Sequence, residues 1–289
     1  MELGAVNVML GELNQPVISR YDLWSRIFRL YKEKKLKSRK RKGYNVVNEF
    51  VDRMINNGAI TYDKEFTESA AYKITGKRGY DAGDIACAVD PFLYVSHLSA
   101  MVFHGLTDRV PHTLFVSTPP NRQWRIFAIE RMKKDLGQWF EEYADAGLPM
   151  LKKIKMEKIN GKLVIQYSSI HQGAFKKTED RNLRVSTIGR TFLDMVREQE
   201  YCGGIRHVME VYAEHGETYK RAIIDHVDRN GKLIEKARVG YLLEERCGVK
   251  DGKMDEWAKN VQRGSSKKLD PAAAYSPIYS ERWCLSINV

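Results

Sequence analysis

Residues 19–57 carry the most informative pattern of the chain and read SRYDLWSRIFRLYKEKKLKSRKRKGYNVVNEFVDRMINN. Ser19, followed three residues later by Asp22, resembles a capping box with a carboxylate in place of the usual Glu or Gln. The pair predicts that a helix begins here. The apolar residues of that helix share one stripe, made of Leu23, Trp24, Ile27, Phe28 and Tyr31.

Basic residues gather between Arg20 and Lys42. Eleven basic residues oppose two acidic ones there, so this stretch carries +9 of the net charge of +11 of the whole chain. A charge that is local rather than spread along the sequence is typical of a surface that docks a polyanion, and nucleic acid is the partner we expect. The alternative is a solvated loop or a localisation tag.

A second helix is predicted from Tyr44 to Asn57, with a buried face formed by Val46, Val47, Phe50, Val51, Met54 and Ile55. Residues 59–62 and 71–75 then predict a β-hairpin. Two helices and a hairpin in about 60 residues are the layout of a winged helix-turn-helix, in which the second helix would enter the major groove. The third helix of that fold is not evident; it would lie within residues 38–44 or around 11–15. The alternative is a small helical cap on a larger domain.

The expected DNA contacts follow from this layout. The basic loop and the wing would hold phosphates, and an Asn side chain can read adenine edges in a major groove. A second basic stretch, in a Gly/Ser-containing loop near the C-terminus, could follow a phosphate backbone or remain a solvated loop. The predicted DNA-binding residues are Lys37, Arg39, Lys40, Arg41, Lys42, Tyr44, Asn45, Asn48, Arg53, Arg263, Lys267 and Lys268.

The best candidate domain boundary is the glycine-containing stretch of residues 76–83, which has no apolar periodicity. We therefore expect a winged helix-turn-helix domain over residues 1–80 and a larger domain over residues 81–289. In the second domain Asn160-Gly161 predicts a type I′ turn between strands 151–159 and 162–168. Further strands are expected at 113–117, 183–185 and 280–289. Helices are expected at 96–105 with Ser96 as cap, at 125–143, after Ser186 as cap, and at 205–212, 219–227, 233–245 and 254–262.

The mixed order of these elements favours an α+β fold over a regular α/β repeat. His97, His104 and His112 do not have the i, i+4 spacing of a metal site, so capping or core hydrogen bonds explain them better, and no metal or other cofactor is expected. Arg190 and Asp194 stand four residues apart on a predicted helix, and we expect a structural ion pair.

Several segments in this order resemble the AbiEi-type antitoxins. They are Tyr94-Val95-Ser96-His97-Leu98-Ser99-Ala100, His104-Gly105-Leu106-Thr107-Asp108, Val185-Ser186-Thr187 with Arg190-Thr191 and Asp194, Cys202-Gly203-Gly204, Gly240-Tyr241-Leu242-Leu243-Glu244, Lys268-Leu269-Asp270-Pro271 and Arg282-Trp283. The resemblance runs from about Val17 to the end of the chain. Its motif residues are Ser96, His97, His104, Asp108, Arg190, Asp194 and Glu244.

This resemblance implies a bacterial antitoxin and transcriptional repressor of an AbiE (type IV) toxin–antitoxin system, a kind of phage defence. Such a protein has an N-terminal winged helix and a C-terminal antitoxin domain. It binds inverted repeats in the double-stranded DNA of its own promoter, where two copies can pair, and it counteracts an AbiEii-like nucleotidyltransferase toxin. The resemblance implies no enzymatic activity. The long basic loop over residues 34–42 departs from the family pattern.

Composition favours a cytoplasmic protein. The four cysteines lie far apart with no CxxC, which fits reduced thiols, and neither a signal peptide nor a run of about 20 apolar residues is present. A metal-dependent nuclease is an alternative, because Asp251-Gly252-Lys253 matches the end of a PD-(D/E)xK motif, although the glycine suits a turn better. Phosphate-loop, nucleophile-elbow and HExxH motifs do not occur. A basic protein-interaction module is the other alternative.

Overall fold

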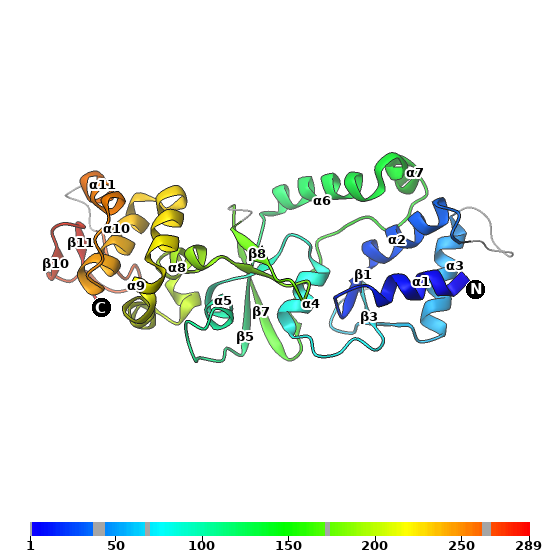
Figure 1. Cartoon of the computed structure of the whole chain (residues 1–289), viewed down its shortest axis with the longest axis horizontal. Coiled ribbons are helices and arrows are strands. Elements are labelled where there is room, and N and C mark those ends of the chain that lie inside the picture. The colour runs from blue at the N-terminus through cyan, green and yellow to red at the C-terminus, as the bar shows by residue number, and fades with distance from the viewer. Residues whose placement is uncertain (1, 37–43, 67–69, 171–173, 262–266) are drawn as a thin grey trace. The chain divides into compact units, whose positions relative to one another are not determined.

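The structure is a computed structural model of the 289-residue chain and describes residues 2–36, 44–66, 70–170, 174–261 and 267–289 (Figure 1). Helices and strands alternate irregularly along the chain, and its largest sheet contains both parallel and antiparallel pairs. The predicted α+β class is therefore confirmed.

The chain forms two compact units. The first contains residues 1–94, 117–172 and 177–184, and the second contains residues 95–116, 173–176 and 185–289. The chain passes between the units within strands β4 (Tyr94–Val95), β5 (Thr113–Thr118), β8 (Phe175–Lys177) and β9 (Arg184–Ser186). The expected domain boundary near residue 80 remains a prediction.

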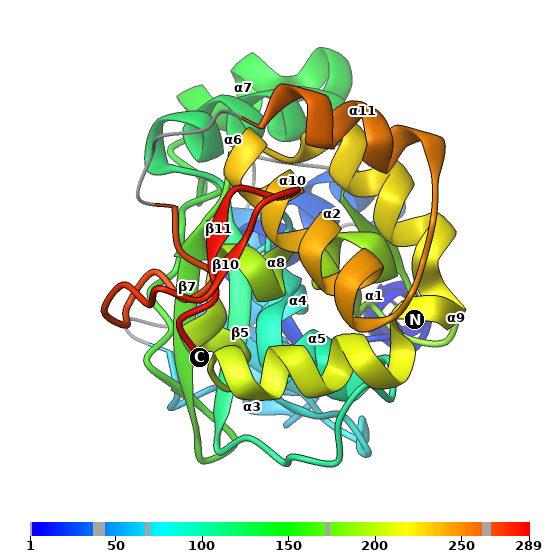
Figure 2. The ribbon, with the colours of Figure 1, turned by 90° about the vertical axis from the view of Figure 1, so that its left-hand side faces the viewer.

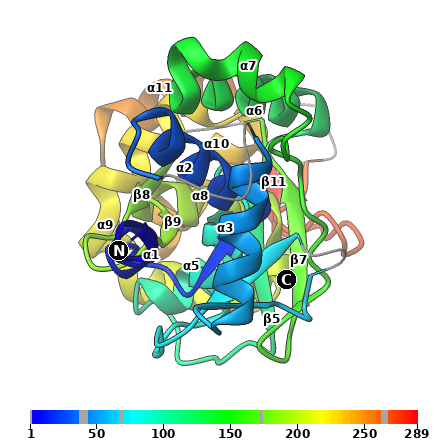
Figure 3. The same cartoon turned by 90° about the vertical axis from the view of Figure 1, so that its right-hand side faces the viewer.

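The N-terminal part of the first unit combines three helices, α1, α2 and α3 (Figure 3), with a three-stranded antiparallel sheet of order β1-β3-β2. The predicted pair of helices and the hairpin are confirmed. Its elements are α1 (Glu2–Gly11), β1 (Val17–Ser19), α2 (Arg20–Lys32), α3 (Asn45–Asn56), β2 (Ile60–Tyr62) and β3 (Ala71–Ile74).

Helix α1 and strand β1 differ from the expectation. The additional helix lies at Glu2–Gly11, upstream of the residues 11–15 considered for it. Its sequence, ELGAVNVMLG, contains glycine, valine and asparagine, which have modest helix propensity, and its apolar residues form no one-sided stripe. Strand β1 pairs with β3, with Ile18 opposite Tyr72, so the hairpin becomes part of a sheet.

Helix α2 begins where the capping residues predict. The backbone N–H of Asp22 donates to Ser19 Oγ at 3.1 Å, and the Ser19 hydroxyl donates to Asp22 Oδ2 at 2.6 Å. Leu23, Ile27 and Phe28 are fully buried beneath this helix, as the stripe predicts. The cap satisfies an amide at the helix start, and the stripe holds the helix on the core.

The rest of the first unit supplies helices beside this N-terminal part. The expected helix over residues 125–143 is broken at Gly137, which has φ +55°, and the expected strand over 151–159 is regular only at its end. The type I′ turn is confirmed, because Asn160 and Gly161 have φ of +48° and +79°. The elements are α4 (Ala82–Val89), α6 (Asn121–Leu136), a 3₁₀ turn (Gly137–Trp139), α7 (Phe140–Asp145), β6 (Lys158–Ile159) and β7 (Lys162–Ser168).

A six-stranded mixed sheet has the order β6-β7-β5-β4-β9-β8, where β8 is Phe175–Lys177. Strands β6 and β7 are antiparallel, as the turn between them requires. Strands β4 and β9 are parallel, with Val95 opposite Val185. The predicted strands at 113–117 and 183–185 are both members of this sheet.

The second unit is mainly helical, and three expectations need correction (Figure 2). The helices predicted at 205–212 and 219–227 are one helix, because Gly216 continues it while packing closely against Leu243 and Cys247. Thr187, not Ser186, occupies the N-cap of α8. The closing strand is short. The elements are α5 (His97–Phe103), α8 (Ile188–Arg197), a 3₁₀ turn (Gln199–Cys202), α9 (Ile205–Asn230), α10 (Leu233–Tyr241), a π-helical turn (Leu242–Arg246), α11 (Gly252–Asn260), β10 (Tyr279–Ser280) and β11 (Leu285–Ser286).

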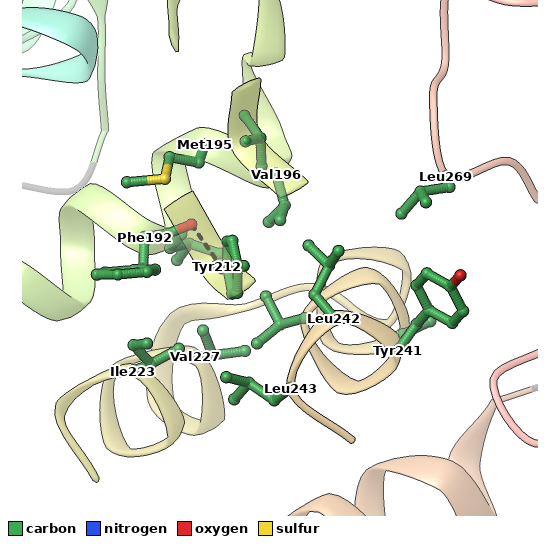
Figure 4. Close-up of a cluster of buried hydrophobic side chains, with 14 of the residues drawn as sticks. Phe192, Met195, Val196, Tyr212, Ile223, Val227, Tyr241, Leu242, Leu243 and Leu269 are labelled. Atoms are coloured by element: carbon green, nitrogen blue, oxygen red, sulfur yellow. Dashed lines mark hydrogen bonds between the residues drawn. The ribbon is translucent and has the colours of Figure 1, made fainter. Parts of the chain in front are cut away.

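The core of this unit forms where α8, α9 and α10 meet (Figure 4). The hydroxyl of the fully buried Tyr212 donates to the carbonyl of Phe192 at 2.9 Å, which satisfies a polar group inside an apolar cluster. The ring of Trp283 lies so close to Gly240 that a Cβ atom there would overlap it. The four cysteines form no disulfide.

Each helix in the described part of the chain is too short or too polar to cross a membrane.

Candidate nucleic-acid interface

Helix α3 and its N-cap carry four of the residues that the sequence predicts to bind DNA. Tyr44 is the N-cap residue, Asn45 and Asn48 are exposed, and Arg53 is half-buried. The Arg53 guanidinium lies over the Phe50 ring, 5.3 Å from its centroid. Because Val47 and Phe50 hold the opposite face in the core, the asparagines are presented to solvent by a fixed element.

The amide of Asn48 is oriented by a neighbouring indole. Trp24 Nε1 donates to Asn48 Oδ1 at 2.8 Å. Since an indole nitrogen can only donate, this bond places the carbonyl oxygen toward Trp24 and leaves the Nδ2 amide free to donate elsewhere. Asn48 is therefore prepared to give hydrogen bonds to an acceptor.

A cleft of about 780 Å³ opens beside α3 within the first unit. Tyr44, Asn45 and Asn48 line one part of it, and residues 148–155 line another. No Asp or Glu is found among the described residues of its lining. Four basic side chains line it: Arg20, Lys152, Lys153 and Lys155. Such a cleft concentrates positive potential.

Among the described residues, the carboxylate that contacts Tyr44 is that of Glu142, and it forms an ion pair with Lys32. The Tyr44 hydroxyl donates to Glu142 Oε1 at 2.5 Å, and Lys32 Nζ lies 2.7 Å from Glu142 Oε2. Lys32, and then Tyr44, lower the pKa of Glu142, while the hydrogen bond to Glu142 raises the pKa of Tyr44 to about 12. Tyr44 thus remains a neutral phenol in this position.

Several of the predicted DNA-binding residues are not among the described residues that line this cleft. Lys37, Arg39, Lys40, Arg41, Lys42 and Arg263 lie outside the described residues. Lys267 and Lys268 belong to the second unit, where the Lys268 ammonium donates to the carbonyl of Ala273 at 2.6 Å. That stretch is not a free loop after residue 267, because Leu269 and Lys267 exchange backbone hydrogen bonds with Ser286.

Residues 148–155 line this cleft but are not among the DNA-binding residues predicted from the sequence. Three lysines in four residues, without an acidic neighbour among them, were the available sign. Residues 151–159 instead predict a strand of a hairpin, and a strand prediction does not indicate that its lysines line a cleft.

Four residues of the AbiEi-like motif meet inside the second unit. Ser96, His97, Arg190 and Asp194 are all fully buried. Arg190 Nε lies 2.7 Å from Asp194 Oδ1, so the expected ion pair is confirmed, and it is excluded from water rather than exposed. Ser96 Oγ lies 2.8 Å from His97 Nδ1, and burial lowers the pKa of His97. A buried pair of this kind is costly to break, because one partner alone would be an uncompensated charge.

The other motif residues have separate surroundings. His104 Nε2 lies 2.7 Å from the carbonyl oxygen of Ser186, and Asp108 is exposed. Glu244 accepts from Arg282 Nε at 2.6 Å and from Trp283 Nε1 at 2.9 Å, which ties the C-terminal segment to the π-helical turn. These contacts are structural, and they explain the positions of His104 and Glu244 by packing.

The described residues contain no group of three His, Cys, Asp or Glu side chains that could hold a metal ion. Asp251, the residue on which the nuclease alternative rests, is the N-cap of α11 and accepts from the Lys253 backbone N–H at 2.8 Å. The Lys253 ammonium instead lies 2.6 Å from Asp225. Asp251-Gly252-Lys253 is thus a helix start.

No protein-family model matches the sequence, and no curated protein matches it. The crystal structure of the RV2827C protein from Mycobacterium tuberculosis is similar, with a TM-score of 0.51. The sequences are 11% identical, and the match covers 98% of this chain and 90% of that chain. The two proteins share a fold. At this identity the similarity carries no further conclusion about activity.

The surroundings of His226, which include the buried Arg190–Asp194 pair, lead to a prediction about acid stability. Burial, and then the Arg190 guanidinium, lower the pKa of His226 on α9 from 6.5 to about 4. Because the folded chain binds this proton less readily than the unfolded chain, His226 contributes stability that is fully present above pH 6.5 and is lost as the pH falls to about 4. Replacing it by His226→Gln should remove this pH-dependent part, as measured by the free energy of unfolding in denaturant between pH 7 and pH 4.

The matched control is His112→Gln, which changes an exposed histidine of the same unit. It should follow the wild-type curve. A His226→Gln protein whose free energy of unfolding differs from wild type by the same amount at every pH would contradict the assignment.

Proposed function

We propose that this protein is a DNA-binding autorepressor and antitoxin of the AbiE type. The observation that carries the proposal is the exposed Asn45 and Asn48 face of α3 beside a cleft lined by basic residues alone among its charged groups. A duplex DNA carries a dense negative charge, and a helix fits its major groove. The cleft and the helix together offer both kinds of contact.

The proposed DNA-binding domain is a winged helix-turn-helix over residues 1–80. The element order α1-β1-α2-α3-β2-β3 and the antiparallel sheet support this proposal. Helix α3 would be the recognition helix, with the β2–β3 hairpin as the wing. Asn45 and Asn48 would meet base edges, and Arg53 and the basic residues between 37 and 42 would contact phosphates.

The proposed antitoxin domain covers residues 81–289, and its partner would be an AbiEii-like nucleotidyltransferase toxin. The support is the ordered set of AbiEi-like motifs. In this proposal the buried Arg190–Asp194 pair and His97 keep the domain in shape rather than perform catalysis. The protein would act in the cytoplasm as a phage-defence component, without enzymatic activity.

The DNA part is tested by an electrophoretic mobility shift with the duplex immediately upstream of the protein's reading frame, against a scrambled duplex at two salt concentrations. We expect preferential binding to the upstream duplex. Asn48→Ala should lower that preference by about 1–3 kcal/mol if the amide reads a base, while the salt dependence stays unchanged. The control is Asn56→Ala, because Asn56 is exposed at the other end of α3. Equal binding to both duplexes by the wild-type protein would refute operator recognition.

The antitoxin part is tested by growth. Expression of a nucleotidyltransferase-like protein encoded beside this one should arrest growth, and co-expression of this chain should restore it. Restoration should persist in the Asn48→Ala protein, because the proposal separates DNA reading from neutralisation. Continued arrest in the presence of soluble wild-type protein would count against the antitoxin role.

A further inference from the structure

The segment between α7 and β6 borders two clefts of the first unit. Residues 151–155 line the cleft of about 780 Å³ beside α3 and also a second cleft of about 550 Å³ beside the start of α6. In the second cleft they meet Asn121, Arg125 and Gln166. One short segment therefore contributes its lysines to two adjoining hollows.

The charged residues that line both hollows are all basic. Among the described residues, Arg20 and Arg125 line one cleft each, the lysines line both, and neither lining includes a carboxylate. This is unusual in a chain in which acidic residues are three quarters as numerous as basic ones, 37 against 48. Concave surfaces lined by one sign of charge concentrate oppositely charged ligands.

The three lysines differ in the contacts that their ammonium groups make. Lys153 is anchored, since its ammonium donates to Asn121 Oδ1 at 3.1 Å and to the Pro119 carbonyl at 3.3 Å. Lys152 is exposed and makes no ion pair within the described part of the chain. Lys155 pairs with Glu157 at 2.5 Å, but both side chains are more than 70% exposed. A pair so open to water contributes little and exchanges readily for a phosphate.

The rings in these clefts argue for a phosphate backbone rather than for stacked single-stranded bases. Trp24 has the Arg20 guanidinium over its ring and Tyr72 beside it, at 5.2 Å and 5.9 Å. Tyr44 is stacked on Phe28, and Trp124 is buried against Phe92. Single-strand binding usually relies on aromatic faces that bases can cover, and these faces are already in contact with protein.

We propose that Lys152 and Lys155, with Arg20 and Arg125, bind the phosphate backbone of the duplex DNA that α3 reads. This inference rests on the proposed DNA-binding function and extends it, because it places three phosphate-binding residues, Arg125, Lys152 and Lys155, outside residues 1–80. The DNA-binding surface then belongs to the whole first unit. A fragment of residues 1–80 alone would keep Arg20 and lack the other three.

The test compares the salt dependence of binding to the upstream duplex for the wild-type protein and for Lys152→Ala/Lys155→Ala. Each lost phosphate contact makes the negative slope of log K against log salt flatter by about 0.9. The slope of the double variant should therefore be flatter than the wild-type slope by about 2. Its affinity should fall by a similar factor on the upstream and scrambled duplexes. Lys152→Arg/Lys155→Arg keeps the charge and should keep the wild-type slope.

The matched control is Lys250→Ala/Lys259→Ala in the second unit. Lys250 is exposed and makes no ion pair that the described structure records, and Lys259 pairs with Glu256 in solvent, so the control repeats the charge change and the pairing. The wild-type slope in the Lys152→Ala/Lys155→Ala protein, or an equal loss in the control, overturns the inference and leaves the proposed function standing. Absence of DNA binding by the wild-type protein overturns both.

Discussion

The carboxylate of Asp22 joins the N-terminal helices to the rest of the first unit. It is 7% exposed and accepts from Ser19 at the start of α2. Its other oxygen lies 2.5 Å from Arg131 Nη2 on α6, 109 residues further along the chain. A carboxylate this buried must be paired and hydrogen-bonded to remain charged. The pair therefore specifies where α6 lies against α2, and the segment that follows α6 inherits that position.

The contacts that continue from Asp22 are aromatic and ionic. Tyr143 on α7 meets the rings of Tyr21 and Phe28 edge-on, at centroid distances of 6.2 Å and 5.1 Å. Glu142 on the same helix is bound by Lys32 and Tyr44. Together they hold α7 beside α2 and the start of α3, so residues 148–155 come to line the same cleft as Asn48. Without the contacts of α7 with α2 and α3, the lysines of residues 148–155 would not be held beside α3.

Local patterns predicted the local structure. The stripe of α2, its Ser19 cap, the buried face of α3 and the Asn160-Gly161 turn depend on neighbours within a few residues. All are confirmed, except that Ile55, expected on the buried face of α3, is only half-buried. The cleft depends on pairs such as Asp22–Arg131, and no spacing in the sequence indicates a partner 109 residues away. The i, i+4 spacing predicted the Arg190–Asp194 pair, but not its burial, because burial depends on the packing of α9, α10 and α5 against α8.

Amide hydrogen exchange of the full chain, with and without the duplex upstream of its reading frame, tests the central claim most directly. The claim is that α3 and the lysine segment form one DNA-binding surface. It predicts slower exchange on adding DNA at residues 44–48 and at residues 150–155, with little change over residues 185–289. Slower exchange confined to residues 185–289, or at 44–48 without 150–155, would contradict it.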